Sequence, residues 1–319
     1  MAYLIGMDEA GYGPNLGPLV ISATLWQVPD AHRNADLYDL LGEVISSGEV
    51  NHRPNDRLAI ADSKRLYQPG GGLAPLERGV LTALALTGKR PDCWRGVWQA
   101  LDPKSSRDRD ALLWYQHYNP PLLLDRAVIE RHAPVLEGGL RRTGASLLAI
   151  SSTAVFPQRF NAAIEQHGNK ATALTRISLA LIGRVLAPIA GSGALIVCDK
   201  HGGRNKYGPL LQEAFPDHLV QVRREGCDES VYRFGPAESP IEIYFRARGE
   251  RFLPAALASM ASKYLRELAM QALNHFWCHR VRKLKPTAGY PVDARRFKAD
   301  IRQVQTELGI DDRLLWRCR

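Results

Sequence analysis

The stretch GMDEAGYGPNLGP, residues 6–18, joins two apolar runs near the start of the chain. These runs, residues 3–7 and 19–26, are short and partly β-branched, and glycines and prolines fill the segment between them. That pattern predicts two strands of an antiparallel meander joined by a turn. Two acids, Asp8 and Glu9, stand side by side where the first run ends.

This acidic pair constrains the local backbone. Neighbouring residues of a regular strand point to opposite faces, so Asp8 and Glu9 reach one site only if the strand ends or bulges there. The glycines and prolines that follow predict such an ending. We therefore expect both carboxylates to face one site at the end of a broken strand.

The composition is that of a globular protein. Its 319 residues are 45% hydrophobic and 24% charged, enough for one large domain or two modest ones. With 42 Lys and Arg against 33 Asp and Glu, the net charge of +9 favours a polyanionic partner such as nucleic acid. The sequence does not indicate an oligomeric state.

Cysteine usage and hydropathy bear on the compartment. The five cysteines are widely spread and form no C-x-x-C pair, which favours a reduced, cytoplasmic protein without a disulfide framework or structural zinc. The first residues lack the basic region of a signal peptide. Arg184, Pro188 and three glycines interrupt the longest apolar stretch, residues 177–198, so no membrane partner is expected.

The remainder of the chain alternates helical and strand patterns. Residues 77–86, 171–186 and 255–277 have helical spacing, and residues 292–308 predict a last helix. The run ALIVCD predicts a buried strand that ends on Asp199, and residues 241–252 alternate like a hairpin. A helix that leads through a Gly-rich turn into a buried strand predicts an α/β fold with a mixed sheet.

Residues 88–119 are basic and aromatic, and include Trp94, Trp98, Trp114 and Tyr115. This segment has two interpretations. Interleaved aromatic and basic side chains can form a surface that stacks on nucleic acid and neutralises it. Alternatively, the tryptophans form a satellite core with a solvated rim.

Four acids share a placement that suggests chemistry. Asp8, Glu9, Asp199 and Glu267 each lie at the end of an apolar strand or on an apolar helix, where an unpaired carboxylate is costly to bury. Carboxylates without His or Cys are hard oxygen ligands, which favour Mg²⁺ or Mn²⁺ over zinc. Two such ions about 4 Å apart can activate water against a phosphodiester and stabilise the leaving oxygen.

Five segments resemble one known family, the type 2 ribonucleases H or ribonuclease HII family. They are DEAGYGP from Asp8, ADSKRL around Lys64, ALIVCDKHGGRNKYGPLLQEAFP around Asp199, ALASMASKYLRE up to Glu267, and GYP around Tyr290. The third segment is similar to the archaeal and eukaryotic branch. All five occur in the family's order, which is more specific than any single motif.

The resemblance implies an RNase H-like mixed sheet flanked by helices and an endonuclease that uses two Mg²⁺ or Mn²⁺ ions. Its substrate would be the RNA strand of RNA/DNA hybrids or ribonucleotides embedded in duplex DNA. By the same resemblance, the catalytic metal ligands are Asp8, Glu9, Asp199 and Glu267. The implied substrate contacts are Gly11, Tyr12, Gly13, Lys64, Ser259, Lys263 and Tyr290, with Tyr290 stacking on a sugar at the RNA–DNA junction.

The resemblance also divides the chain. Residues 1–68 and 161–273 would form the two parts of the RNase H-like core. Residues 69–160 would be an insertion with basic and aromatic residues and a linking segment, and residues 274–319 a C-terminal helical extension.

Three positions depart from the family pattern or stand beside its acids. Tyr12 replaces the family's arginine between two glycines, so a charge contact is lost while glycine backbone groups remain for sensing a 2′-hydroxyl. Glu267 stands where the family has aspartate, which moves the carboxylate by about 1.5 Å. His201 is either a proton-transfer group or a polar loop residue beside a turn.

Two other functions were weighed. A catalytically weakened RNase H-like nucleic-acid-binding protein would leave the clustered acids without a purpose, because phosphate binding gains nothing from negative charge. A nucleotide-phosphate loop at GYGPNLG misses the G-x-G-x-x-G spacing by one residue, and its prolines remove backbone donors.

Overall fold

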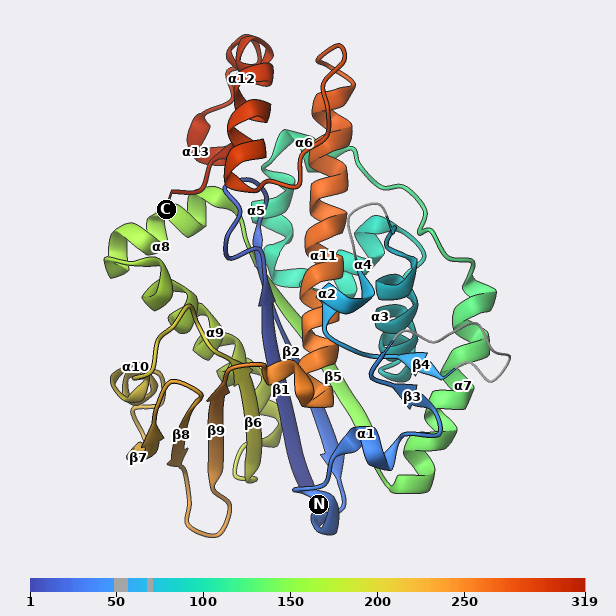
Figure 1. Ribbon diagram of the computed structural model, residues 1–319, viewed down its shortest axis with the longest axis vertical. Helices are drawn as coiled ribbons and strands as arrows, with labels where there is room; N and C mark the ends of the chain where they lie inside the picture. Colours follow the sequence, from blue (N-terminus) through green and yellow to red (C-terminus); the bar gives the residue numbers. More distant parts are fainter. Residues whose placement is uncertain (49–56, 68–70, 319) are drawn as a thin grey trace.

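A seven-stranded mixed sheet forms the centre of the protein (Figure 1), whose computed structural model describes residues 1–48, 57–67 and 71–318. The strand order is β5-β2-β1-β6-β9-β8-β7. The strands are β1 (Ala2–Ala10), β2 (Leu19–Val28), β5 (Ser146–Val155), β6 (Ala194–Asp199), β7 (Gln221–Glu225), β8 (Glu229–Phe234) and β9 (Ile241–Arg246); β3 (Ile45–Ser46) and β4 (Leu58–Ala59) pair separately. The mixed α/β sheet flanked by helices is confirmed, whereas the expected division between residues 68 and 69 lies outside the described residues.

Helices cover both faces of this sheet. The longer ones are α3 (Ala74–Leu86), α4 (Trp94–Leu101), α7 (Arg126–Thr143), α8 (Pro157–His167), α9 (Lys170–Leu186), α11 (Leu253–Cys278) and α12 (Pro291–Glu307). The shorter ones are α1 (Leu37–Leu40), α2 (Ser63–Leu66), α5 (Ser106–Asp110), α6 (Leu113–Gln116), α10 (Gly208–Ala214) and α13 (Asp312–Leu315). The 3-10 turns are η1 (Asp30–His32), η2 (Pro103–Ser105), η3 (Ala187–Ile189) and η4 (Gly249–Arg251).

Strand direction determines where the acids lie. β1 runs antiparallel to β2 and parallel to β6, and the last pair of the β1–β6 ladder joins Met7 to Cys198. Parallel neighbours end at the same edge of a sheet. Asp8 follows Met7 and Asp199 follows Cys198, so the two aspartates lie side by side where this ladder ends.

The two faces of β1 pack against different helices. Leu4 belongs to a hydrophobic cluster with α11, and Ile5 and Met7 belong to a second cluster with α9. At Gly6 a Cβ atom would lie 2.0 Å from the backbone of Ala255, so only glycine lets α11 approach β1 this closely. Figure 1 shows α11 crossing the sheet over β1 and β2.

The stretch at residues 170–189, mostly α9, has the length and hydropathy of a membrane-spanning helix, and 56% of its apolar window is buried inside the fold. Leu174, Leu181 and Ile182 pack into the second cluster with β6 and β9. A core helix has this composition as well.

Several sequence predictions are confirmed and two are wrong. α9, β6, α11 and α12 occur where the patterns predicted them, and β1 and β2 form the antiparallel pair. The predicted strand ending at Asp8 is wrong, because β1 continues in regular register to Ala10, which pairs with Val20. Residues 241–252 are not a hairpin: β9 pairs with β6 and β8, and a 3-10 turn follows it.

For residues 88–119 the structure favours the interpretation in which the tryptophans are buried, except that their core is not separate from the main one. Trp94, Trp98 and Trp114 are at most 3% exposed and belong to the same cluster as α11, and the indole nitrogen of Trp94 donates a hydrogen bond to the carbonyl of Leu268 at 2.9 Å. These rings cannot stack on nucleic acid, and they form core rather than a satellite. The segment expected as an insertion, residues 69–160, also supplies the edge strand β5 to the sheet.

The burial of these rings generates a stability prediction. We expect Trp98→Ala to lower the free energy of unfolding by about 3–5 kcal/mol through the cavity it leaves, and to leave nucleic-acid affinity unchanged under conditions where the variant is folded. Leu123→Ala, at a 63% exposed site, is the control and should change stability by less than about 0.5 kcal/mol. Denaturant unfolding and fluorescence anisotropy measure the two quantities. A selective loss of binding by folded Trp98→Ala would contradict the structural role.

Candidate metal and nucleic-acid site

Two carboxylates meet where the ladder between β1 and β6 ends, at the C-terminal end of β6. The Asp8 side chain lies on the α11 face, where the nearby Ser259 hydroxyl acts to lower its pKa, and Ser262 Oγ donates to the Asp8 carbonyl at 3.0 Å. The Asp199 carboxylate accepts a hydrogen bond from the backbone N–H of Gly249 at 3.2 Å. Strand order and α11 together hold the two acids near each other.

The electrostatics of this pair disfavour two negative charges. Burial raises the pKa of Asp8 to about 7, and the neighbouring Asp199 raises it as well, against opposing effects of Ser259 and the Glu9 N–H. Burial also raises the pKa of Asp199. Both groups would gain from a nearby positive charge.

Glu9 lies on the opposite face from Asp8. The β1–β2 register is unbroken at this point, with Asp8 opposite Ser22 and Glu9 opposite Ile21, so the two side chains alternate. Burial, followed by the charges of Asp8 and Asp199, raises the pKa of Glu9 well above its usual value. Glu9 is therefore close enough to interact electrostatically with the pair, although the expected break in the strand is absent.

The ADSKRL segment brings a lysine to the carboxylates. Asp62 caps α2 by accepting the N–H of Lys64 at 3.1 Å, and the hydroxyls of Ser63 and Ser259 lie 3.0 Å apart. Burial lowers the pKa of Lys64, but Asp62, Asp8 and Asp199 outweigh this effect and raise it. Lys64 thus stays charged, exposed and close to Asp8, and its implied contact with the substrate stays a prediction.

Glu267 lies in an ion-pair network. Its carboxylate accepts hydrogen bonds from Lys263 at 2.7 Å, Arg266 at 3.2 Å and the Tyr67 hydroxyl at 3.1 Å. The predicted i, i+4 contact between Lys263 and Glu267 is thereby confirmed. The carboxylate acts here as the counter-ion of Arg266, whose side chain is only 2% exposed.

The donor set decides which predicted ligands fit a metal. Within residues 1–48, 57–67 and 71–318, no three Asp, Glu, His or Cys side chains are grouped closely enough to hold one metal ion. The four predicted ligands are therefore not assembled into one centre. Asp8 and Asp199 fit a hard divalent cation, because they are oxygen donors whose charges repel each other in a partly buried position.

The glycine loop after β1 lies beside the predicted junction tyrosine. Gly11 has φ +91°, and a Cβ there would lie 2.6 Å from Nε of Arg266, so both conformation and space require glycine. Gly13 is exposed, and a Cβ at Gly13 would lie 3.9 Å from the ring of Tyr290, which is 53% exposed. Gly13 and Tyr290 are thus brought together, as the motifs predict.

Tyr12 packs away from that junction. Its ring lies under the Lys170 amine, 4.4 Å from the ring centre, and its hydroxyl lies against Gly202. The side chain therefore rests on the start of α9 and the loop after β6. Ser262, Tyr67 and Arg317 also contact this region and were not predicted. Ser262 lies within one of the family-like motifs and Tyr67 directly follows another, whereas nothing in the sequence next to Arg317 marks it.

His201 is a buried structural residue. Its Nδ1 lies 3.0 Å from the Thr175 hydroxyl, and its backbone N–H donates to the Tyr207 hydroxyl at 3.1 Å. Burial lowers the pKa of His201 to about 3. The ring is neutral at physiological pH, which favours the polar-loop interpretation over proton transfer.

Solved structures similar to this chain are ribonucleases H of type 2. An RNase HII in a PCNA complex from Archaeoglobus fulgidus is 13% identical over 99% of this chain and 94% of its own, with a TM-score of 0.40. Ribonuclease H2 from Pyrococcus horikoshii OT3 is 13% identical over 98% and 92%, with a TM-score of 0.45. The Bst-RNase HIII in complex with Mn²⁺ is 13% identical over 99% of this chain and 66% of its own, with a TM-score of 0.43.

Comparisons with protein-family models and with curated protein sequences gave no match. At 13% identity and TM-scores below 0.5, the solved structures assign no function to this chain. Its site has to be interpreted from its own residues.

The raised pKa of Asp8 generates a pH-dependent prediction. Because the folded state binds the Asp8 proton more tightly than the unfolded state, stability should fall as pH rises from about 4 to 7. Asp8→Asn removes this penalty, so in EDTA it should raise the free energy of unfolding more at pH 8 than at pH 4, by on the order of 4 kcal/mol. Asp36→Asn, at an exposed helix cap where Asn serves equally well, should change neither value. Destabilisation by Asp8→Asn at pH 8 would contradict the account.

Neutralising Glu267 should destabilise the protein, whereas neutralising Asp8 should stabilise it. Glu267→Gln leaves buried Arg266 without its counter-ion, so we expect a loss of about 3 kcal/mol in the free energy of unfolding. The control Glu130→Gln breaks the exposed pair with Arg126 and should cost less than about 0.5 kcal/mol. Urea unfolding measures the free energy of unfolding of both variants. Equal losses would show that the Glu267 network stabilises the protein no more than an exposed ion pair does.

Proposed function

We propose that this protein is a metal-dependent endoribonuclease of the ribonuclease H type. Its substrate would be the RNA strand of RNA/DNA hybrids or ribonucleotides embedded in duplex DNA. The observation that carries the proposal is the pair Asp8 and Asp199, side by side where the parallel ladder of β1 and β6 ends, with Lys64 and Ser259 beside it. Ends of strands in α/β sheets are where such sites form.

Each residue at this edge has a part in the proposed reaction. Asp8 and Asp199 would hold Mg²⁺ or Mn²⁺, which when bound supplies an activated water and stabilises the leaving oxygen of a phosphodiester. Lys64 would neutralise a phosphate oxygen, and Ser259 keeps the Asp8 carboxylate oriented. A second ion, with Glu9 and Glu267 as ligands, stays a prediction, because Glu267 is engaged by Lys263 and Arg266.

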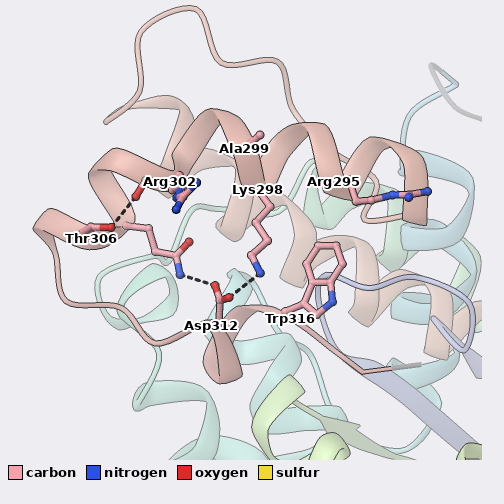
Figure 2. A pocket seen from close by; sticks show the side chains of 8 residues that line it. Arg295, Lys298, Ala299, Arg302, Thr306, Asp312 and Trp316 are labelled. Atoms are coloured by element: carbon pink, nitrogen blue, oxygen red, sulfur yellow. Dashed lines mark hydrogen bonds and ion pairs between the residues drawn. The ribbon is translucent and has the colours of Figure 1, made fainter.

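A basic groove supports a polyanionic partner. Arg295, Lys298 and Arg302 lie on one side of α12 and line a groove of about 700 Å³ against Trp316 and Asp312 (Figure 2). Lys298 donates to Asp312 at 2.6 Å, and Arg295 and Arg302 are exposed. This groove and the net charge of +9 suit phosphate contacts.

The Gly11–Tyr12–Gly13 loop and Tyr290 would contact the ribose at the RNA–DNA junction. Lys263, whose position is set by its ion pair with Glu267, would also contact the substrate. Backbone groups can distinguish a 2′-hydroxyl, which separates RNA from DNA. With Tyr12 packed against α9, this recognition would come from the loop backbone.

A cleavage assay tests the proposal. Purified protein is incubated with DNA that carries one embedded ribonucleotide and with a continuous RNA/DNA hybrid, each in Mg²⁺ and in Mn²⁺. We expect nicking at the ribonucleotide strand and a loss of at least about 100-fold in Asp199→Asn, because a ligand charge is removed from the site. Asp36→Asn is the matched control and should cut like the wild type.

The alternative, a catalytically weakened RNase H-like binding protein, gives a different result. It predicts salt-sensitive binding that is the same in Asp199→Asn and the wild type, with no cleavage in either metal. That outcome would overturn the enzymatic proposal. We also propose a reducing, cytoplasmic location, supported by five cysteines that are all free thiols.

A further inference from the structure

The segment that follows α13 lies across the loop after β1. Trp316 forms a β-bridge with Leu16, and the Arg317 N–H donates to the Asn15 carbonyl at 2.8 Å. The Asn15 side-chain amide donates in turn to the Arg317 carbonyl at 3.0 Å. Residues 300 positions apart are thereby joined backbone to backbone, and Figure 1 shows the end of the chain close to α8 and this loop.

Asn161 of α8 fixes the same segment from its other side. Its side-chain amide donates to the Trp316 carbonyl at 2.8 Å, and its side-chain oxygen accepts the Cys318 N–H at 2.8 Å. The segment is therefore held by three elements, the loop, α8 and α13.

This anchoring places a guanidinium under the loop. The Arg317 side chain is 1% exposed, its Nη2 donates to the carbonyls of Gly11 and Pro14, and its guanidinium lies 5.0 Å from the ring centre of Phe160. Among the described residues no carboxylate pairs with it, and its Nε and Nη1 have no acceptor. Burying such a charge is costly, so the loop carbonyls are its compensation.

Peptide geometry converts these contacts into a loop conformation. All the described peptides are trans, so the C=O and N–H of one peptide point in opposite directions. With the Gly11 carbonyl on Arg317, the next N–H, that of Tyr12, points away from the buried side. The peptide between Pro14 and Asn15 is arranged in the same way. Its carbonyl accepts from Arg317, and its N–H, that of Asn15, points the other way and donates to the Gly289 carbonyl at 2.8 Å.

A second arginine holds the other end of the loop. Arg266 Nη2 lies 3.5 Å from the Leu16 carbonyl and donates to the Ala288 carbonyl at 3.0 Å, and its Nε occupies the space where Gly11 would need a Cβ. The loop thus lies between two buried guanidinium groups.

We infer that Arg317 is a positioning residue that sets the backbone of the Gly11–Gly13 segment for ribose recognition. It turns the Gly11 and Pro14 carbonyls inward and leaves the N–H of Tyr12 for a substrate oxygen. In this chain the guanidinium at this loop comes from residue 317, whereas position 12 holds a tyrosine that packs against Lys170. The part of this inference that concerns ribose rests on the proposed function.

Hydrogen exchange tests the positioning itself, without any substrate. Arg317→Met keeps the length of the side chain and removes its donors, and Asn161→Ala releases the segment without altering Arg317. We expect both to speed amide exchange in residues 11–17 by about tenfold or more, and Arg317→Lys to fall between them and the wild type. Arg313→Met, an exposed arginine on α13, should exchange like the wild type. Wild-type exchange of the loop in both Arg317→Met and Asn161→Ala would overturn the inference.

Binding selectivity tests the link to ribose. The ratio of Kd for a DNA duplex to Kd for an RNA/DNA hybrid of the same sequence is measured by anisotropy in EDTA. We expect Arg317→Met to reduce this ratio about tenfold with little change in DNA affinity, whereas a purely structural role would leave the ratio unchanged and overturn this part. If the wild type itself binds both duplexes equally, the proposed function fails, and the exchange measurement alone decides whether Arg317 positions the loop.

Discussion

The proximity of Asp8 and Asp199 is the constraint on which the site depends. It follows from the parallel pairing of β1 and β6, whose ladder ends at Met7 and Cys198. Burial raises the pKa of both carboxyl groups, and the charge of Asp199 raises the pKa of Asp8 further. A bound cation would stabilise both carboxylates in their charged forms. The helix α11 and the short helix α2 are placed so that hydroxyls and Lys64 surround this edge.

A second set of charges is compensated within the protein. Arg266 and Lys263 share Glu267 as their counter-ion, and Arg317 donates from Nη2 to the carbonyls of Gly11 and Pro14. The contrast divides the acids by role: carboxylates with basic partners maintain the fold, and carboxylates that repel each other are available for a cation. This division explains why the four acids of the sequence motifs do not converge on one point.

Sequence patterns predicted the elements whose signal is local. The apolar run before Asp199, the long helix that carries Lys263 and Glu267, and the paired strands around the glycine loop all formed as expected. β7 was missed because its five residues are all exposed, so no alternation marks it. The buried tryptophans were open to two interpretations because a ring's burial depends on packing against α11, far away in sequence.

The candidate site was also predictable only where the sequence near a residue carries a local signal. The resemblance pointed to Asp8, Asp199, Lys64 and Ser259, which lie together, and to Glu267, which is engaged elsewhere. The direction of Glu9 follows from an unbroken β1–β2 register, which glycine and proline counts could not reveal. The contact of Arg317 with Gly11 joins residues 306 apart, and nothing near either residue indicates it.

The central claim is that Asp8 and Asp199 jointly hold a divalent cation. Anomalous scattering from a crystal of the protein soaked in Mn²⁺ tests it most directly. The account predicts a manganese peak within about 2.5 Å of carboxylate oxygens of both residues, absent in Asp199→Asn. A peak located elsewhere, or no peak at a Mn²⁺ concentration that supports cleavage, would contradict it.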